Sequence, residues 1–234
     1  MKLEICANSY QSAINAQKAG ADRIEICSEL SVGGITPSYG LLKKISQEIK
    51  IPVNVLIRPR SGDFCYSDDE FEIMKKNIKL CKKFGFNGIV SGVLNADNSI
   101  DIQRTKELIT LSNPLSFTFH RAFDCVLNPE KSLEILIEIG VDRILTSGLE
   151  EKAKDGIELL KRLQKIAENK LIILAGSGIN SKNAFHFKEA GFKEIHTSAS
   201  KIIQIEKSTF FGANVQTISD ISKIKGILKV IKNA

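Results

Sequence analysis

The sequence predicts an α/β protein, a single (β/α)8 TIM barrel that spans residues 1–234 as one domain. Eight short β-prone segments alternate with longer helical segments, a four-fold internal repeat marks every second strand, and no GxGxxG motif follows the first strand. Alternating strands and helices impose parallel pairing and right-handed crossovers. An open, doubly wound sheet is the alternative, and the eight units without that glycine motif disfavour it.

The eight predicted strands are short, and most are rich in isoleucine, valine and leucine. This composition is typical of parallel strands whose two faces are covered. In chain order, the predicted strands cover residues 2–6, 23–27, 53–58, 88–91, 115–120, 143–147, 171–175 and 194–198.

Helix signals fall between these strands. Ser67 and Glu70 have the spacing of a capping box, in which the two side chains satisfy exposed backbone donors at a helix start. The apolar residues that follow at three- and four-residue steps predict one buried helix face; they are Phe71, Met74, Ile78 and Cys81. Residues 201–214 show no helical period, and we expect a mobile loop there over the mouth of the barrel.

A repeated outline of glycine followed by a strand supports closure into a barrel. The string GADRIEIC at 20–27 recurs in outline at 85–92, 140–147 and 191–198. In each copy a glycine can end a helix in the left-handed conformation, and a strand begins three residues later. These copies mark the even-numbered strands, as expected of four quarter units that form one closed barrel.

Composition restricts the class of protein. The net charge of +6 is mild and the lysines follow helix patterns, so we expect no nucleic-acid partner. No apolar run reaches the ~18 residues of a membrane span, and the N-terminus lacks a signal-peptide pattern, which predicts a cytoplasmic protein without membrane contact. Five cysteines without a CxxC motif argue against a disulfide framework or a zinc ribbon. Isoleucine-rich helices are compatible with a homodimer, and the oligomeric state stays open.

Polar side chains are predicted to fill the interior of the barrel. Ile24 and Ile26 suit the helix layer, so the alternating residues of that strand, Arg23, Glu25 and Cys27, face inward. The same alternation turns a further polar set inward: Glu4, Cys6, Asn54, Arg58, Ser116, Thr118, His120, Arg143, Ser147, Glu194, His196 and Ser198. Buried charges must pair, so near the strand starts we expect ion pairs such as Arg23 with Glu4 or Glu194. Groups at the carboxyl ends are expected to form a site, because barrel active sites lie there.

Seven segments carry strings that recur in one known family. They are GADRIEIC at 20–27, GGITPS at 33–38, IRPRSGDF at 57–64, TFHRAFD at 118–124, RILTSG at 143–148, GSGI at 176–179 and HTS at 196–198. In these strings, and in their order from residue 4 to about residue 200, the chain resembles the CutC family. The resemblance implies a TIM-barrel fold, a cytoplasmic location and a role in copper homeostasis.

Two cysteines are candidates for the implied copper role. Cys6 and Cys27 end adjacent strands, which lie about 4.8 Å apart, so the two thiols could approach one soft ion. Thiolates select Cu(I) among cytosolic metals. Two small cysteines that simply pack beside the strand ends are the alternative. Cu(I) is the cofactor or ligand that we expect on this hypothesis, and no organic cofactor is predicted.

A second set of charged residues favours an enzyme. Glu25, His120 and Asp124 are candidate catalytic residues, because a histidine beside carboxylates can serve as a general acid or base. Arginines and glycine-rich turns suit a small anionic ligand; the candidate binding residues are Arg58, Arg60, Asp63, Gly176, Gly178, His196 and Ser198. Ion pairs that only hold the loops together are the alternative. This second hypothesis is a TIM-barrel enzyme that performs acid–base chemistry on a phosphorylated or carboxylated metabolite.

Overall fold

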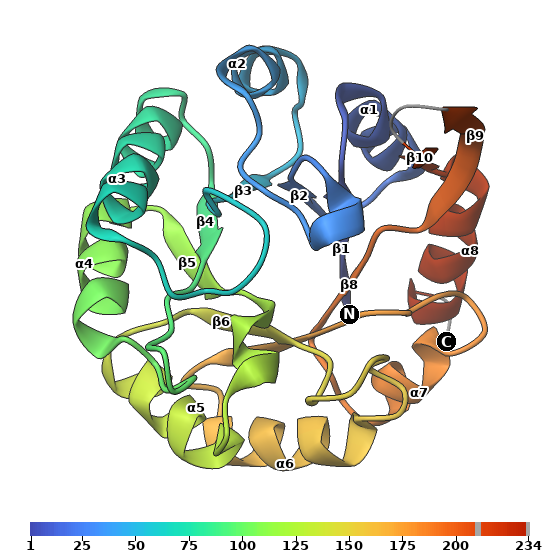
Figure 1. Ribbon diagram of the computed structural model, residues 1–234. Helices are drawn as coiled ribbons and strands as arrows, with labels where there is room; N and C mark the ends of the chain where they lie inside the picture. Colours follow the sequence, from blue (N-terminus) through green and yellow to red (C-terminus); the bar gives the residue numbers. More distant parts are fainter. Residues whose placement is uncertain (209–211, 233–234) are drawn as a thin grey trace.

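Eight parallel strands close into a barrel that a ring of helices surrounds (Figure 1). The computed structural model describes residues 1–208 and 212–232. Strand order follows chain order, and β8 pairs with β1 to complete the closure. The predicted strand ends differ from the observed ones by two residues at most. The barrel strands are β1 (Lys2–Ala7), β2 (Arg23–Ile26), β3 (Val53–Leu56), β4 (Gly88–Ser91), β5 (Ser116–Phe119), β6 (Arg143–Thr146), β7 (Ile172–Gly176) and β8 (Glu194–Thr197).

One helix follows each barrel strand along the chain. The predicted capping box before the third helix is present, with Ser67 and Glu70 bonded to each other's backbone N–H groups. The helices are α1 (Tyr10–Ala19), α2 (Tyr39–Glu48), α3 (Asp68–Lys83), α4 (Ile102–Ser112), α5 (Pro129–Glu138), α6 (Ile157–Ala167), α7 (Ala184–Glu189) and α8 (Ile221–Lys232), with 3-10 turns η1 (Leu30–Val32) and η2 (Arg121–Cys125).

The two faces of the sheet differ in chemistry, as the alternation predicts. Residues such as Ile5, Ile24 and Val55 are fully buried in the apolar core between strands and helices. Full burial of each such side chain stabilises the fold by about 1.5–3 kcal/mol. Inside the barrel the apolar cluster is small, and it consists of Cys6, Cys27, Leu56 and Val90 with Leu30 packed against them. Most of the remaining interior is therefore polar.

Glycines end the helices that precede the even-numbered strands. Gly20 has a φ of 88° and its N–H bonds to carbonyls of the last turn of α1. Its counterparts Gly85, Gly140 and Gly191 have φ of 73°, 87° and 79°. A side chain costs energy in this left-handed region, so the repeat seen in the sequence has a backbone cause.

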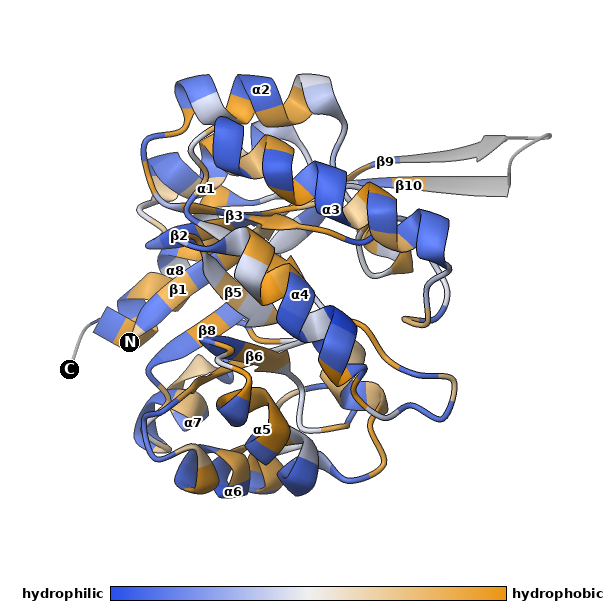
Figure 2. Ribbon diagram, turned by 90° about the vertical axis from the view of Figure 1, so that its left-hand side faces the viewer, coloured by the Kyte–Doolittle hydropathy of each residue, from blue (hydrophilic) through white to orange (hydrophobic). Residues whose placement is uncertain are grey.

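The segment after β8 overturns one prediction. The expected mobile loop over 201–214 is wrong for the described part of that segment. There the chain forms β9 (Ser200–Ser208) and β10 (Gly212–Ser219), which pair antiparallel. The described base of the hairpin lies at the rim of the barrel (Figure 2). A hydrogen bond holds the base of the hairpin to the segment after β1, because Asn8 donates to Thr217 Oγ1 at 3.0 Å.

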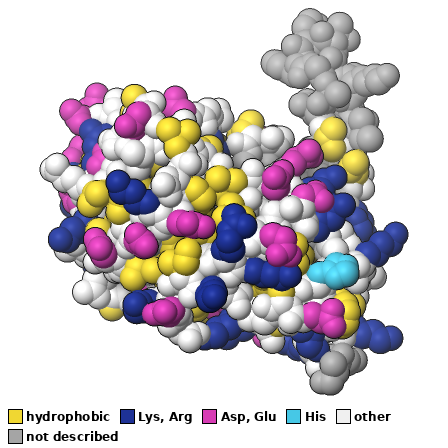
Figure 3. Space-filling model, turned by 90° about the horizontal axis from the view of Figure 1, so that it is seen from below, with side chains coloured by type: hydrophobic (Ala, Val, Ile, Leu, Met, Phe, Trp, Pro, Cys, Tyr) yellow, Lys and Arg dark blue, Asp and Glu magenta, His cyan; other side chains and the backbone are white. Residues whose placement is uncertain are grey.

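The outer surface is mixed in charge. Figure 3 shows one face of the molecule, on which basic and acidic side chains are interspersed among apolar ones. Within the two described ranges, no helix is both long enough and apolar enough to cross a membrane.

Candidate functional site

An ion-pair network closes the amino-terminal end of the barrel. Arg23 donates through Nε to Glu4, and its Nη2 lies 2.5 Å from Glu194 Oε2. Arg143 adds a second contact to Glu194, at 3.1 Å. These are the ion pairs that the sequence predicts for the strand starts. The candidate site lies at the other end of the barrel, at the carboxyl ends of the strands.

A buried pair of thiols lies above this network. The Sγ atoms of Cys6 and Cys27 are 3.6 Å apart, and Glu25 Oε1 is 3.9 Å from Cys6 Sγ. The hydrogen bond with Cys27, burial, and the nearby Glu25 carboxylate together raise the pKa of the Cys6 thiol well above its ordinary value. The two strand ends therefore bring together the two thiols that the sequence proposes as metal ligands.

Glu25 and His196 extend the thiol pair into a mixed cluster. One ligand atom from each of Cys6, Glu25 and His196 lies within 4.8 Å of the other two. Burial, assisted by the charge of Glu4 and opposed by His196, raises the pKa of Glu25 to about 7. His196 Nδ1 lies 2.8 Å from Glu4 Oε1. Burial works against the charged imidazole, but the hydrogen bond to Glu4 and the carboxylates outweigh it, so the pKa of His196 is raised.

Glu25 also leaves one polar atom unused. Its side chain is buried, and Oε2 has no hydrogen-bond partner among the described residues. A buried carboxylate oxygen without a partner is costly, and a cation or a proton at this position would relieve the cost. Sulfur, oxygen and nitrogen donors that could hold a metal ion therefore converge here.

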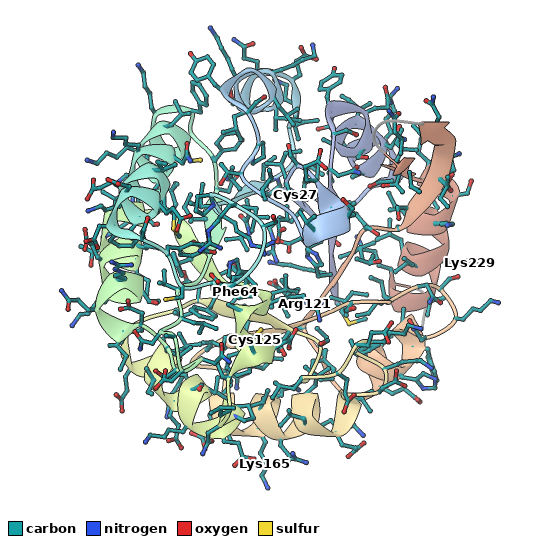
Figure 4. The ribbon with its side chains drawn as sticks, in the orientation of Figure 1. Cys27, Phe64, Arg121, Cys125, Lys165 and Lys229 are labelled. Carbon is teal, nitrogen blue, oxygen red and sulfur yellow. The ribbon has the colours of Figure 1, made fainter. Side chains whose placement is uncertain are left out.

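A cavity of about 880 Å³ opens above this cluster at the carboxyl ends of the strands. Cys6, Glu25 and His196 lie along its wall, together with His120 and Arg121. Figure 4 looks into the barrel and shows Phe64, Arg121 and Cys125 near the centre of the ring. The location agrees with the general rule that barrel sites form at this end.

His120 enters the cavity as a neutral imidazole. Its ring packs against Phe64 with 4.9 Å between centroids, and Gly92 makes room for it, because a Cβ there would lie 2.8 Å from Nδ1. Nδ1 accepts the Ala122 N–H at 3.2 Å, which places the ring hydrogen on Nε2. Burial and the charge of Arg58 lower the pKa of His120 to about 3. Within the part of the chain that the structure describes, Nε2 has no partner.

The two arginines after β3 hold the surrounding loops together through hydrogen bonds and ion pairs. Arg58 is buried and donates to the carbonyls of Val32, Gly34 and Gly62 at 2.6–3.0 Å. Arg60 binds Asp63 at 2.9 Å and, on α3, Glu70 at 2.5 Å.

Arg58 lies in the cavity wall, whereas Arg60 and Asp63 are not among its lining residues. The geometry thus matches the loop-scaffolding alternative for Arg60 and Asp63.

Asp124 also joins two loops. It accepts hydrogen bonds from the backbone N–H groups of Ser147 at 3.0 Å and Leu149 at 3.3 Å, and from Arg121 Nε at 2.7 Å. No contact joins it to His120 among the described hydrogen bonds and ion pairs. The predicted pairing of a histidine with a carboxylate occurs instead between His196 and Glu4.

The two glycines at the end of β7 and in the turn that follows it have different roles. Gly176 lies inside the barrel, where an added Cβ would meet Leu145 Cδ1 at 2.5 Å and His196 Cβ at 3.3 Å. Gly178 and Ser198 line the mouth of the cavity. Close packing explains the first glycine, and only the second borders space that a ligand could enter.

The sequence matches one protein family over most of its length. Residues 1–201 match the model of the CutC family. The chain belongs to the CutC family. A CutC family protein of Photorhabdus laumondii is 44% identical over 94% of this chain and 88% of its own length. The human copper homeostasis protein cutC homolog is 41% identical over 99% of this chain and 89% of its own length.

Solved structures agree with the CutC assignment. A structure described as the copper homeostasis protein CutC of Streptococcus agalactiae matches with a TM-score of 0.80 and 34% identity. The match covers 85% of this chain and 98% of that one. An aldolase, QR15, matches with a TM-score of 0.62 at 17% identity, which shows the shared barrel fold alone.

Three further basic side chains of this CutC protein line the cavity: Arg121 from η2, Lys182 from the segment after β7, and Lys223 from α8. Reasoning from the sequence places Arg121 beside His120 in the TFHRAFD string, and it missed the two lysines. The two lysines carry no local motif, and only the path of the chain brings them to the mouth.

Proposed function

We propose that this protein takes part in copper homeostasis by binding Cu(I) through Cys6 and Cys27. The observation that carries the proposal is the buried pair of thiols, 3.6 Å apart, at the ends of adjacent strands. The names of the human and streptococcal relatives support the copper role. A cytoplasmic location is part of the proposal, and it is supported by the five cysteines, which are all free thiols.

The donor set suits a soft, singly charged ion. Leu56 and Val90 pack around the two sulfurs, and Cu(I) prefers thiolate ligands over the oxygen ligands that Mg²⁺ prefers. Glu25 and His196 lie close enough to supply a further donor. Because the thiols must lose protons when they bind the ion, and because the pKa of Cys6 is raised, apparent affinity should increase with pH.

An anaerobic titration tests the proposal. Reduced protein is titrated with Cu(I) against bicinchoninate, and the variants Cys6→Ser and Cys27→Ser are compared with wild type. We expect one ion per chain and a loss of at least about 100-fold in affinity in each variant. Cys65→Ser is the matched control, because this exposed loop cysteine lies outside the cavity. Equal affinity in wild type and in both barrel variants would refute copper binding at this pair.

A further inference from the structure

The outer half of the cavity differs in chemistry from its sulfur-containing floor. We propose that it binds a small organic anion, a carboxylate or a phosphate ester. In this proposal Arg121, Lys182 and Lys223 face the charged end of the ligand, and His120 donates a hydrogen bond to one of its oxygens. None of these four residues is a thiol, so the proposal does not rest on copper binding.

The charges that line the cavity leave an excess of positive groups. Arg58 already donates to three carbonyls, and Asp124 is saturated by Arg121 and backbone N–H groups. Lys182 and Lys223 are exposed, and the Arg121 side chain is 44% exposed. The free hydrogen-bonding capacity at the mouth is therefore mainly cationic.

The basic groups keep donors available for a ligand. Lys223 Nζ uses one hydrogen bond, to the Ser200 carbonyl at 2.6 Å, and an ammonium group has three donors. Arg121 uses Nε for Asp124 and Nη2 for Ser147 Oγ at 3.0 Å. Those two bonds fix the plane of the guanidinium over the cavity, and a fixed guanidinium loses less entropy when it binds an anion.

His120 supports an anion site independently of the basic side chains. The residue is 4% exposed, and its Nε2–H has no acceptor among the described residues. A buried donor without a partner is costly unless a ligand or a water molecule satisfies it. A neutral N–H donor suits an oxygen of the ligand, and Phe64, whose ring is tilted by 57° against the imidazole, also lines the cavity.

The volume of the cavity indicates the size of the ligand, and the basic groups indicate its chemical class. A cavity of about 880 Å³ is of the size that holds small organic molecules, and it is much larger than an inorganic ion requires. Carboxylates and phosphate esters share the feature that the basic groups recognise, which is a cluster of anionic oxygens.

Calorimetry on the full, reduced, metal-free chain tests the proposal with three probes. Glycerol 3-phosphate and malonate represent the two anion classes, and glycerol is the neutral control. We expect at least one anion to bind one to one with a Kd below about 1 mM, and glycerol not to bind. Binding should weaken about 10-fold at about 0.5 M salt, because the basic groups are exposed and screened. The stronger of the two anions identifies the class.

Substitutions connect binding to the named groups. Lys182→Gln and Lys223→Gln should each weaken binding about 3- to 10-fold, and His120→Phe should do the same or more. Lys161→Gln, on the outer face of α6, is the matched control and should change nothing. The double variant Cys6→Ser/Cys27→Ser should bind the anion like wild type, which separates this site from the copper site.

Three results would overturn the proposal. They are a Kd above about 1 mM for both anions, equal binding of glycerol, and unchanged affinity in both lysine variants. The lysines are exposed, so their variants test the site even if His120→Phe does not fold.

Discussion

Removal of the Arg23 guanidinium should destabilise the barrel severely. In Arg23→Met, Glu4 and Glu194 lose the charge that lies between them, and their side chains are only 1% and 4% exposed. Loss of one partner from a buried ion pair typically costs about 3–5 kcal/mol.

The pKa of Glu4 gives a second measure of the same interaction. Burial raises this pKa, but the hydrogen bond to His196 and the charge of Arg23 lower it from 4.5 to about 2. The gap corresponds to roughly 3 kcal/mol, which is what remains of the contributions of both partners after the cost of burial. A folded-state pKa below the unfolded value stabilises the fold above pH 4.5, and that contribution is lost as pH falls toward 2.

Urea unfolding of wild type and variant, at neutral pH and at about pH 4.5, measures both effects. The variant should lose about 3–5 kcal/mol at neutral pH and less at the lower pH, because without the guanidinium burial favours the protonated form of the two carboxyl groups, which needs no counter-charge. Arg162→Met is the control, because its pair with Glu130 is exposed, and it should cost less than about 1 kcal/mol. A loss below about 1 kcal/mol in Arg23→Met, or a loss that grows on acidification, would refute this reasoning.

Three further outcomes are expected. Gly176→Ala should cost about 1–3 kcal/mol in thermal unfolding, because its Cβ would overlap Leu145. In imidazole NMR, His120 should remain the neutral Nε2–H tautomer between about pH 5 and 8, and titration near 6.5 would contradict this. Because that pKa is lowered, the contribution of His120 to stability is complete above 6.5 and is lost as pH falls toward about 3. Gly20→Ala should cost about 1 kcal/mol in urea unfolding, whereas Gly40→Ala, in α2 with no close neighbours, should be neutral or stabilising.

The repeating parts of this molecule could be predicted from the sequence. The order of strands and helices follows from alternating apolar runs, and the two-residue period of each strand decides which side chains enter the barrel. That period is sufficient to bring Arg23 to Glu4 and Cys6 to Cys27, because adjacent parallel strands fix the distances between their ends.

The loops could not be predicted in the same way. Arg58 and Arg60 look equivalent in the string IRPRSGDF, but loop geometry gives one of them three carbonyls and the other two carboxylates. Lys182 and Lys223 reach the cavity only because of how their segments run across the mouth. Local periodicity carries no information about such paths.

The hairpin was missed for a related reason. The polar and apolar residues after Ser198 alternate over a short stretch without a helical period. Such a pattern predicts a strand only if a partner strand is recognised as well, and the partner here is the equally short segment that begins at Gly212.

The two ends of the hairpin lie side by side, so the chain leaves the barrel and returns to it at the same place. Ser200 is paired with Ser219, and Asn15 holds the Ser219 carbonyl at 2.9 Å. The pairing of β8 with β1 uses residues that precede this point. The number of residues in the hairpin therefore does not affect the pairing of β8 with β1 that closes the barrel. A peptide or a reporter domain could replace the outer part of the hairpin without altering the register of the barrel.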